Sequence, residues 1–245
     1  MKTLIEYQGV YKAFGKKKIY EDLDLEVRQG ETLTIIGGSG TGKSVLLKCL
    51  IGLLYPDAGT VLFDGNDVTQ MDEKGLRAVR KRVSMVFQGS ALFDSLTVGE
   101  NIAYPLRENM RELSEDEIQK RVAKKLELVN LAGIEAMKPS DLSGGMRKRV
   151  GLARAIATDP EVILWDEPTT GLDPISTRII DELIISMKKT LGATSIVVTH
   201  DMDSAFRVSD RMAMLARRKI VESGTVSQMQ ASKNPDVRAF FDARK

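Results

Sequence analysis

A glycine-rich stretch that ends in a lysine and a serine is the part of this sequence best suited to chemistry on phosphates. It consists of Gly37, Gly38, Ser39, Gly40, Thr41, Gly42, Lys43 and Ser44. Glycine has no Cβ and tolerates positive φ, so the backbone N–H groups of such a loop can surround a phosphate closely. The Lys43 ammonium would then reach the β- and γ-phosphates of a nucleotide, and the Ser44 hydroxyl would bind Mg²⁺. The stretch therefore predicts a site for a nucleoside triphosphate and a magnesium ion.

The residues on either side of this loop fit the same chemistry. Residues 31–36 become fully apolar toward the loop, which is typical of a buried strand. Apolar residues after the loop indicate one face of a helix, whose N-terminus would add to the anion site. They are Val45, Leu46, Leu47, Leu50, Ile51, Leu53 and Leu54. A glycine-rich turn with a chance lysine is the alternative, and the strand–loop–helix context argues against it.

Two carboxylates follow another apolar run. Residues 161–165 read as a strand buried on both faces, and Asp166 and Glu167 come directly after it. A phosphate site needs a carboxylate to hold the metal, and Asp166 fits that role through a water ligand. Glu167 is placed to orient or deprotonate an attacking water. The alternative is an exposed acidic pair in a turn, which a position behind an apolar strand disfavours.

Gln88 and His200 also stand at the ends of expected strands. Gln88 follows the apolar residues 83–87, and His200, the only histidine of the chain, follows residues 194–199. A lone histidine is usually structural, but ligands of such folds bind at the carboxyl edge of the parallel sheet. We therefore expect Gln88, the two carboxylates and His200 to meet the glycine-rich loop at one edge. His200 would contact the γ-phosphate there.

A second glycine-containing stretch precedes another expected helix. Leu142 is followed by Ser143, Gly144, Gly145 and Met146, and a serine with two glycines at a helix start forms an anion cradle. One chain thus carries two phosphate-binding surfaces. Either the second surface folds over the first within one chain, or a second copy supplies it across an interface.

The order of the expected elements predicts an α/β fold. A strand at residues 3–8 is followed by alternating apolar residues from Ile19 to Val27, which indicate an antiparallel strand. Residues 10–15 are expected to form a turn, in which Tyr11 and Phe14 would more commonly pack into the core than contact a ligand. Later strands alternate with helices, which predicts a mainly parallel sheet. These strands are expected at residues 60–64, 83–87, 161–165, 194–199, 211–216 and 220–226.

Strand signals are absent between residues 89 and 159. Residues 114–117 form a capping box, and the apolar stripe of the following helix is read as core packing. That stripe comprises Ile118, Val122, Leu126 and Val129. We therefore expect a single domain, residues 1–245, with a helical subdomain at about 89–159 inserted into the α/β core.

Composition limits the class of protein. The chain has 245 residues and is 42% hydrophobic, which suits one large domain. Its 36 Lys and Arg residues nearly balance 34 Asp and Glu residues, so the net charge of +2 gives no electrostatic reason to expect nucleic acid. The longest mostly apolar run, residues 45–55, is too short to span a bilayer. With no signal peptide at its start and a single cysteine, Cys49, the chain is expected in the cytoplasm.

These motifs, in their types, order and spacing, resemble those of ATP-binding-cassette ATPases over nearly the full chain. The corresponding motifs are the P-loop (37–44), the Q-loop (Gln88), the signature (142–146), Walker B (162–167), the D-loop (171–173) and the H-loop (His200). The resemblance implies a head-to-tail homodimer, in which Ser143, Gly144 and Gly145 of one copy close over ATP on the P-loop of the other.

The resemblance also implies further roles for single residues. Phe14, rather than Tyr11, would stack on adenine because its distance before the P-loop matches the family. Gln88 would contact the metal together with Ser44 and Asp166, and Asp173 would act in the D-loop. Met146 departs from the family, which usually has glutamine there.

Residues 89–108, together with the signature, are similar to those of Mla-type ATPases, which energise phospholipid movement between the membranes of Gram-negative envelopes. That similarity implies an integral membrane permease, accessory subunits such as a lipid-binding partner, and a peripheral position on the cytoplasmic face of the inner membrane. Leu92, Phe93, Leu96 and Val98 form an apolar cluster here. We expect two of them to pack internally and the rest to line a groove for a permease helix.

An importer or exporter ATPase for another cargo is the nearest alternative. Cassette ATPases that act on DNA or ribosomes form a different class, which the sequence disfavours. Only 100 residues separate Lys43 from Ser143, without the sustained heptads of a long coiled coil, and the chain holds one cassette rather than two. It also lacks the N-K-x-D motif of a GTPase.

Overall fold

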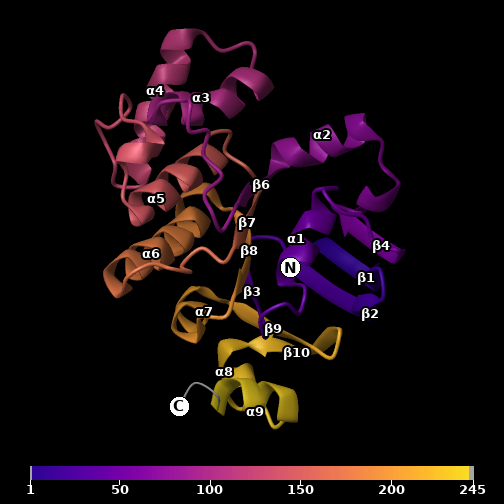
Figure 1. Cartoon of the computed structure of the whole chain (residues 1–245). Helices are drawn as coiled ribbons and strands as arrows, with labels where there is room; N and C mark the ends of the chain where they lie inside the picture. The colour runs from indigo at the N-terminus through magenta and orange to yellow at the C-terminus, as the bar shows by residue number, and fades with distance from the viewer. Residues whose placement is uncertain (1, 243–245) are drawn as a thin grey trace.

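The computed structural model describes residues 2–242 (Figure 1). Met1 and residues 243–245, which fall within the predicted domain 1–245, lie outside the described residues. Over the described chain, strands form a six-stranded sheet in the order β10-β9-β3-β8-β7-β6 and a four-stranded sheet in the order β2-β1-β4-β5.

The six-stranded sheet is parallel except at its edge strand β10. Its parallel strands are β6 (Val83–Val86), β7 (Val162–Asp166), β8 (Thr194–Thr199), β3 (Thr32–Ile36) and β9 (Arg211–Ala216). The edge strand β10 (Lys219–Thr225) pairs antiparallel with β9. This arrangement confirms the predicted α/β fold with a mainly parallel sheet.

Helices cover both faces of this sheet, which explains why its central strands are apolar. Every residue of β3, β7 and β8 is buried. Along β7, Val162 and Leu164 belong to the core that includes α1 (Lys43–Leu50), on one face. The alternate residues Ile163 and Trp165 belong to the core of α5 (Gly144–Ala155) and α6 (Pro174–Leu191), on the other face.

The four-stranded sheet is antiparallel and corrects one expectation. Its strands are β2 (Lys17–Arg28), β1 (Thr3–Phe14), β4 (Ala58–Phe63) and β5 (Asn66–Asp67). The expected turn at residues 10–15 is wrong, because β1 continues to Phe14. Register shifts after Tyr7 and a left-handed Gly9 (φ 54°) interrupt the alternation that marks a strand, so the sequence pattern resembled a turn.

The helix after the glycine-rich loop is shorter than expected. α1 ends at Leu50, and Gly52 follows in the left-handed conformation with φ 63°. The Gly52 N–H donates to the Cys49 carbonyl at 3.2 Å, and the Leu53 N–H donates to the Lys48 carbonyl at 2.9 Å. These two bonds form a Schellman motif that stops the helix. Leu53, assigned to the helix face from the sequence, is instead half exposed.

Only helices and loops lie between β6 and β7 in the described chain. They are α3 (Val98–Asn109), α4 (Glu115–Leu128), a 3₁₀ turn (Pro139–Asp141) and α5. The predicted capping box is confirmed, because the Ser114 hydroxyl caps α4 and the Glu117 carboxylate accepts from the Ser114 N–H. The predicted apolar stripe is buried against α3 and α5. Figure 1 shows this helical segment projecting beyond the sheet, at the upper left.

The remaining helices complete the chain. They are a 3₁₀ turn (Val68–Gln70), α2 (Glu73–Arg82), α7 (Met202–Val208), α8 (Val226–Gln230) and α9 (Pro235–Asp242). α9 packs through Val237 with Met212 and Met229. Between residues 2 and 242, no helix combines the length and the apolar character needed to cross a membrane.

Candidate nucleotide-binding site

The glycine-rich loop joins β3 to α1, as the sequence predicted. The Lys43 ammonium donates to the carbonyls of Gly37 and Gly38, at 2.9 and 3.1 Å. Glycine is required at position 42, where φ is 108° and a Cβ would lie 2.5 Å from the Ile19 side chain. Its backbone can therefore pass close to β2 and still open toward a phosphate.

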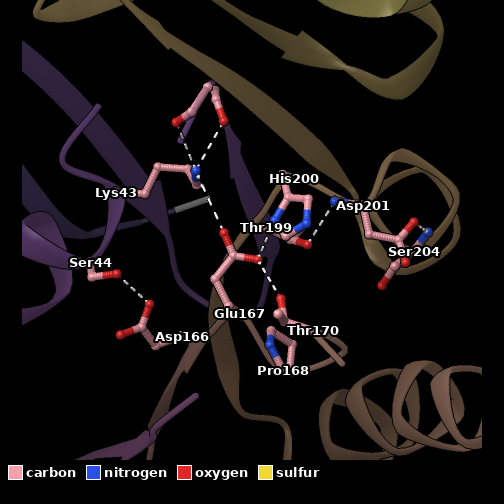
Figure 2. Close-up of polar contacts among 12 residues, drawn as sticks. Lys43, Ser44, Asp166, Glu167, Pro168, Thr170, Thr199, His200, Asp201 and Ser204 are labelled. Carbon is pink, nitrogen blue, oxygen red and sulfur yellow. Dashed lines mark hydrogen bonds and ion pairs between the residues drawn. The ribbon is translucent and has the colours of Figure 1, made fainter. Parts of the chain in front are cut away.

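Ser44 and Asp166 meet at the sheet edge. The Ser44 hydroxyl donates to Asp166 Oδ1 at 2.5 Å, and the Asp166 side chain is buried (Figure 2). Burial raises the pKa of Asp166, and the Ser44 hydroxyl opposes that rise. Hydroxyl and carboxylate oxygens are ligands that suit Mg²⁺, which binds few protein groups when phosphates supply the rest. No cluster of three or more His, Cys, Asp or Glu side chains able to hold a metal occurs in residues 2–242.

Glu167 lies between Lys43 and His200 (Figure 2). Its Oε1 is 3.5 Å from Lys43 Nζ, and its Oε2 is 2.8 Å from His200 Nδ1 and accepts from the Thr170 hydroxyl at 3.0 Å. The Glu167 backbone adopts φ 50°, an unfavourable left-handed conformation for a residue with a side chain. The Glu167 N–H donates to the Val198 carbonyl of β8 at 2.9 Å, which helps to hold that conformation.

One cleft of about 540 Å³ brings together most of the predicted residues. Phe14, Ser39, Gly40, Gly42, Lys43, Ser44, Gln88, Glu167 and His200 line it, together with Lys17, Ile19 and Val45. Tyr11 is not among the lining residues, and Phe14 is 47% exposed rather than packed in the core. Lys17 and Ile19 were not predicted to line the cleft, although both lie at the start of β2, the strand that follows Phe14.

The second glycine-containing stretch does not line this cleft. Ser143 caps α5, and its hydroxyl accepts from the Met146 N–H at 3.2 Å. Asp173 caps the neighbouring helix α6 and accepts from the N–H groups of Ile175 and Ser176, both at 2.9 Å. A Cβ on Gly145 would lie 3.0 Å from the Ser176 hydroxyl, so the two helix starts are closely packed.

α5 also carries two contacts that the sequence analysis missed. The Lys148 ammonium donates to the carbonyls of Pro168 and Thr170, at 2.9 and 2.6 Å. The Arg154 guanidinium donates to the carbonyls of Ser90 and Ala91, at 2.9 and 2.8 Å. No sequence motif marks these contacts, because each cation binds backbone carbonyls rather than a partner side chain.

A phosphate loop at the carboxyl edge of a mainly parallel sheet, with carboxylates on a neighbouring strand, defines the chain as a P-loop nucleoside triphosphatase. Family comparison narrows this class. A family model described as "ABC transporter" matches residues 20–170, so the chain belongs to the ABC transporter family. It is an ATPase of that family.

Relatives with transport names match all or nearly all of the chain. "Probable ribonucleotide transport ATP-binding protein mkl" of Mycobacterium leprae is 44% identical over 100% of this chain and 70% of the relative. "Intermembrane phospholipid transport system ATP-binding protein MlaF" of Haemophilus influenzae is 42% identical over 98% of this chain and 90% of the relative. The MlaF protein of Escherichia coli K12 is 41% identical over 98% of this chain and 89% of the relative.

Solved structures share the fold. A dimeric ATP-binding cassette, MJ0796, in a post-hydrolysis state with ADP and Pi, has a TM-score of 0.84 at 31% identity. The match covers 91% of this chain and 99% of that one. CbiO1 of Clostridium perfringens, part of an ABC transporter complex, has a TM-score of 0.86 at 29% identity, over 100% of this chain and 96% of that one.

Proposed function

We propose that this chain is the ATP-hydrolysing subunit of a membrane transporter that moves phospholipids between the inner and outer membranes. The observation that carries hydrolysis is the position of Glu167, held between Lys43 and His200 at the edge of the nucleotide cleft. The cargo follows from the MlaF relatives, because this chain matches 90% of the H. influenzae MlaF length. It matches 70% of the ribonucleotide-transport relative, which makes ribonucleotides the second candidate cargo.

ATP binds on residues 37–44, with Phe14 stacked on the adenine and Lys43 at the β- and γ-phosphates. The Lys43 ammonium donates to carbonyls of the loop itself and therefore points across the loop. Ser44, Asp166 and the Gln88 amide would hold Mg²⁺, which supplies charge neutralisation at the phosphates when bound. Their oxygen donors support this assignment.

Glu167 acts as the general base for the attacking water. His200 and Thr170 hold one carboxylate oxygen, and Lys43 lies near the other, so the side chain is fixed in direction before the substrate arrives. His200 and Gln88 contact the γ-phosphate, and its loss after hydrolysis would release both. This preorganisation is supported by the low exposure of the Glu167 side chain, which is 12%.

Two copies assemble head to tail, with Ser143, Gly144 and Gly145 of one closing over ATP on the P-loop of the other. The absence of these residues from the lining of their own cleft supports this arrangement. So does the dimeric state of the related cassette MJ0796. Asp173 and the 75% exposed Ile175 beside it would then lie at the interface.

A membrane permease docks beside the Q-loop, where an apolar groove is lined by Met85, Phe87, Phe93, Tyr104 and Pro105. The Phe93 and Tyr104 rings are 5.1 Å apart, and both are nearly half exposed. Of the predicted cluster, Val98 is buried and Leu92 partly buried. Phe93 lines the groove, whereas Leu96 is not among its lining residues. Docking there would place the chain peripherally on the inner face of the membrane.

Reconstitution tests this proposal. The chain is purified with the integral membrane protein that binds it, and both are placed in liposomes with a fluorescent phospholipid or a radiolabelled ribonucleotide. We expect ATP-dependent movement of the phospholipid and none of the ribonucleotide. Movement of the ribonucleotide alone would show that the cargo is a ribonucleotide rather than a phospholipid. Stimulation of ATP hydrolysis by DNA or ribosomes instead of the membrane protein would show that the chain is not a transporter ATPase.

A further inference from the structure

Lys148 lies at the point where the signature helix contacts the loop that carries Glu167. The side chain projects from the second turn of α5 and places its ammonium on two carbonyls, those of Pro168 and Thr170. Pro168 directly follows Glu167, and the hydroxyl of Thr170, in the same loop, donates to Glu167 Oε2. The ammonium therefore fixes the backbone on the C-terminal side of Glu167 and the hydroxyl that orients it.

The Lys148 contact is a partly buried, charged hydrogen bond rather than surface packing. The Lys148 side chain is partly buried, and burial lowers the pKa of its ammonium, while the charge of Glu167 opposes that change. A charged donor on two carbonyls forms stronger hydrogen bonds than a neutral one. The loop needs such support, because Glu167 has a left-handed backbone (φ 50°) that is held only by its surroundings.

The N-terminus of α5 links the Lys148 contact to the signature residues. Ser143 caps this helix and Gly144 begins it, so the signature and Lys148 belong to one rigid element. In the proposed dimer that signature contacts the nucleotide of the second copy. When the signature moves toward that nucleotide, α5 moves with it, and Lys148 would pass this movement to the Glu167 loop of its own chain.

We propose that Lys148 is a positioning residue for Glu167, which couples closure of the signature on one nucleotide to alignment of the base at the other. This inference rests on the proposed function, in particular on Glu167 as the base. Lys148 does not contact the nucleotide cleft, so its effect on the reaction passes through the loop from Glu167 to Thr170.

The test is a double-mutant cycle on the full-length chain. Steady-state ATP hydrolysis is measured for wild type, Lys148→Met, Glu167→Gln and the double variant, with Lys124→Met as the matched control. Lys124 is an exposed lysine on α4, remote from the cleft lining. Binding of mant-ATP and the thermal unfolding midpoint are measured on the same samples.

We expect Lys148→Met to lower kcat by roughly tenfold to a hundredfold, since misplacing a catalytic group by about 1 Å has effects of this size. KM and mant-ATP affinity should stay near wild type, and Lys124→Met should match wild type throughout. Because Lys148 acts through Glu167, the double variant should be no slower than Glu167→Gln alone.

Two results would overturn the inference. One is a kcat within twofold of wild type for Lys148→Met, and the other is a further tenfold loss when Lys148→Met is added to Glu167→Gln. Should Lys148→Met fail to fold, Lys148→Gln keeps an amide NH2 group for the carbonyls but removes the charge, and its kcat loss without a KM change decides in the same way. Near-normal hydrolysis by Glu167→Gln would instead reject the proposed base, a separate failure.

Discussion

At the scale of single residues, the site is prepared by contacts among its own side chains. The Ser44 hydroxyl is already bonded to Asp166, and Glu167 is already held by His200 and Thr170. The left-handed backbone of Glu167 costs about 1–3 kcal/mol, which the surrounding strands must offset. Backbone strain at Glu167 is expected if the orientation of its carboxylate matters more for function than its contribution to stability.

The aromatic residues of β1 give a prediction at this scale. Phe14 lines the nucleotide cleft and Tyr11 does not, although both are similarly exposed. Phe14→Ala should raise KM for ATP, by about tenfold for a lost stacking contact of 1–3 kcal/mol, and leave kcat near wild type. Tyr11→Ala is the matched control and should change neither value. A larger rise in KM for Tyr11→Ala than for Phe14→Ala would show that Tyr11, and not Phe14, stacks on the adenine.

How far the sequence predicted the site depends on how each residue acts. Gln88, Glu167 and His200 come just after strands, so strand ends alone bring them to the cleft. Asp166 ends β7 and reaches the cleft through its bond to Ser44. Lys148 binds carbonyls that are 20 and 22 residues away, and only the packing of α5 against the loop makes that contact. The sequence contains no pattern for such a bond, because every residue offers a carbonyl.

At the scale of elements, several contacts constrain the junction between the Q-loop and the helical segment. Ser90 and Ala91 both adopt left-handed backbone conformations, with φ of 62° and 49°. Arg154 binds both of their carbonyls, and the buried Asn101 side chain accepts from the Phe93 N–H and donates to the Phe93 carbonyl. A shift of Gln88 would therefore move Phe93 as part of a connected unit rather than a loose loop.

The exposed Phe93 ring gives the prediction for this junction. Phe93→Asp should abolish both co-purification of the membrane partner and its stimulation of ATP hydrolysis, because a charge replaces an apolar anchor of the groove. Leu53→Asp is the matched control, since Leu53 is similarly exposed but does not line this groove. Retention of both properties by a folded Phe93→Asp variant would place the docking surface elsewhere.

The antiparallel sheet that carries Phe14 gives a stability prediction. Gly59 is the second residue of β4 and Gly65 lies just after its end, and both have left-handed backbones, with φ of 84° and 77°. A Cβ at position 59 would lie 2.1 Å from the Gly9 carbonyl oxygen, whereas a Cβ at position 65 meets nothing within 4 Å. Gly65→Ala should cost about 1–2 kcal/mol of unfolding free energy. Gly59→Ala should cost more than about 3 kcal/mol, because backbone must also move. Equal urea midpoints for the two variants would contradict this account.

Elements were predictable from the sequence where one pattern persisted. The continuous apolar run of β7, the shorter apolar stretches of β3 and β8 and the capping box of α4 were visible without tertiary information. The end of β1 was predicted too early because bulges break its alternation of buried and exposed residues. The end of α1 was predicted too late because apolar residues continue past Gly52. Those boundaries depend on backbone conformation rather than on hydrophobic pattern.

At the scale of the whole molecule, the proposed head-to-tail dimer would give each chain half of two composite sites. Its own cleft contains the P-loop, Glu167 and His200, while its Ser143–Gly145 stretch lies outside that cleft. In the proposed head-to-tail dimer the helical segment of one copy meets the α/β core of the other. Binding of ATP would then drive closure, and hydrolysis would drive opening, with the permease following through the groove at Phe93.

The measurement that tests this account most directly is ATP turnover by Glu167→Gln, combined with size-exclusion chromatography in ATP and Mg²⁺. We predict retained ATP binding, a loss of hydrolysis of roughly a hundredfold or more, and an ATP-dependent dimer that wild type does not accumulate. Turnover within a few-fold of wild type, with no accumulated dimer, would contradict the account.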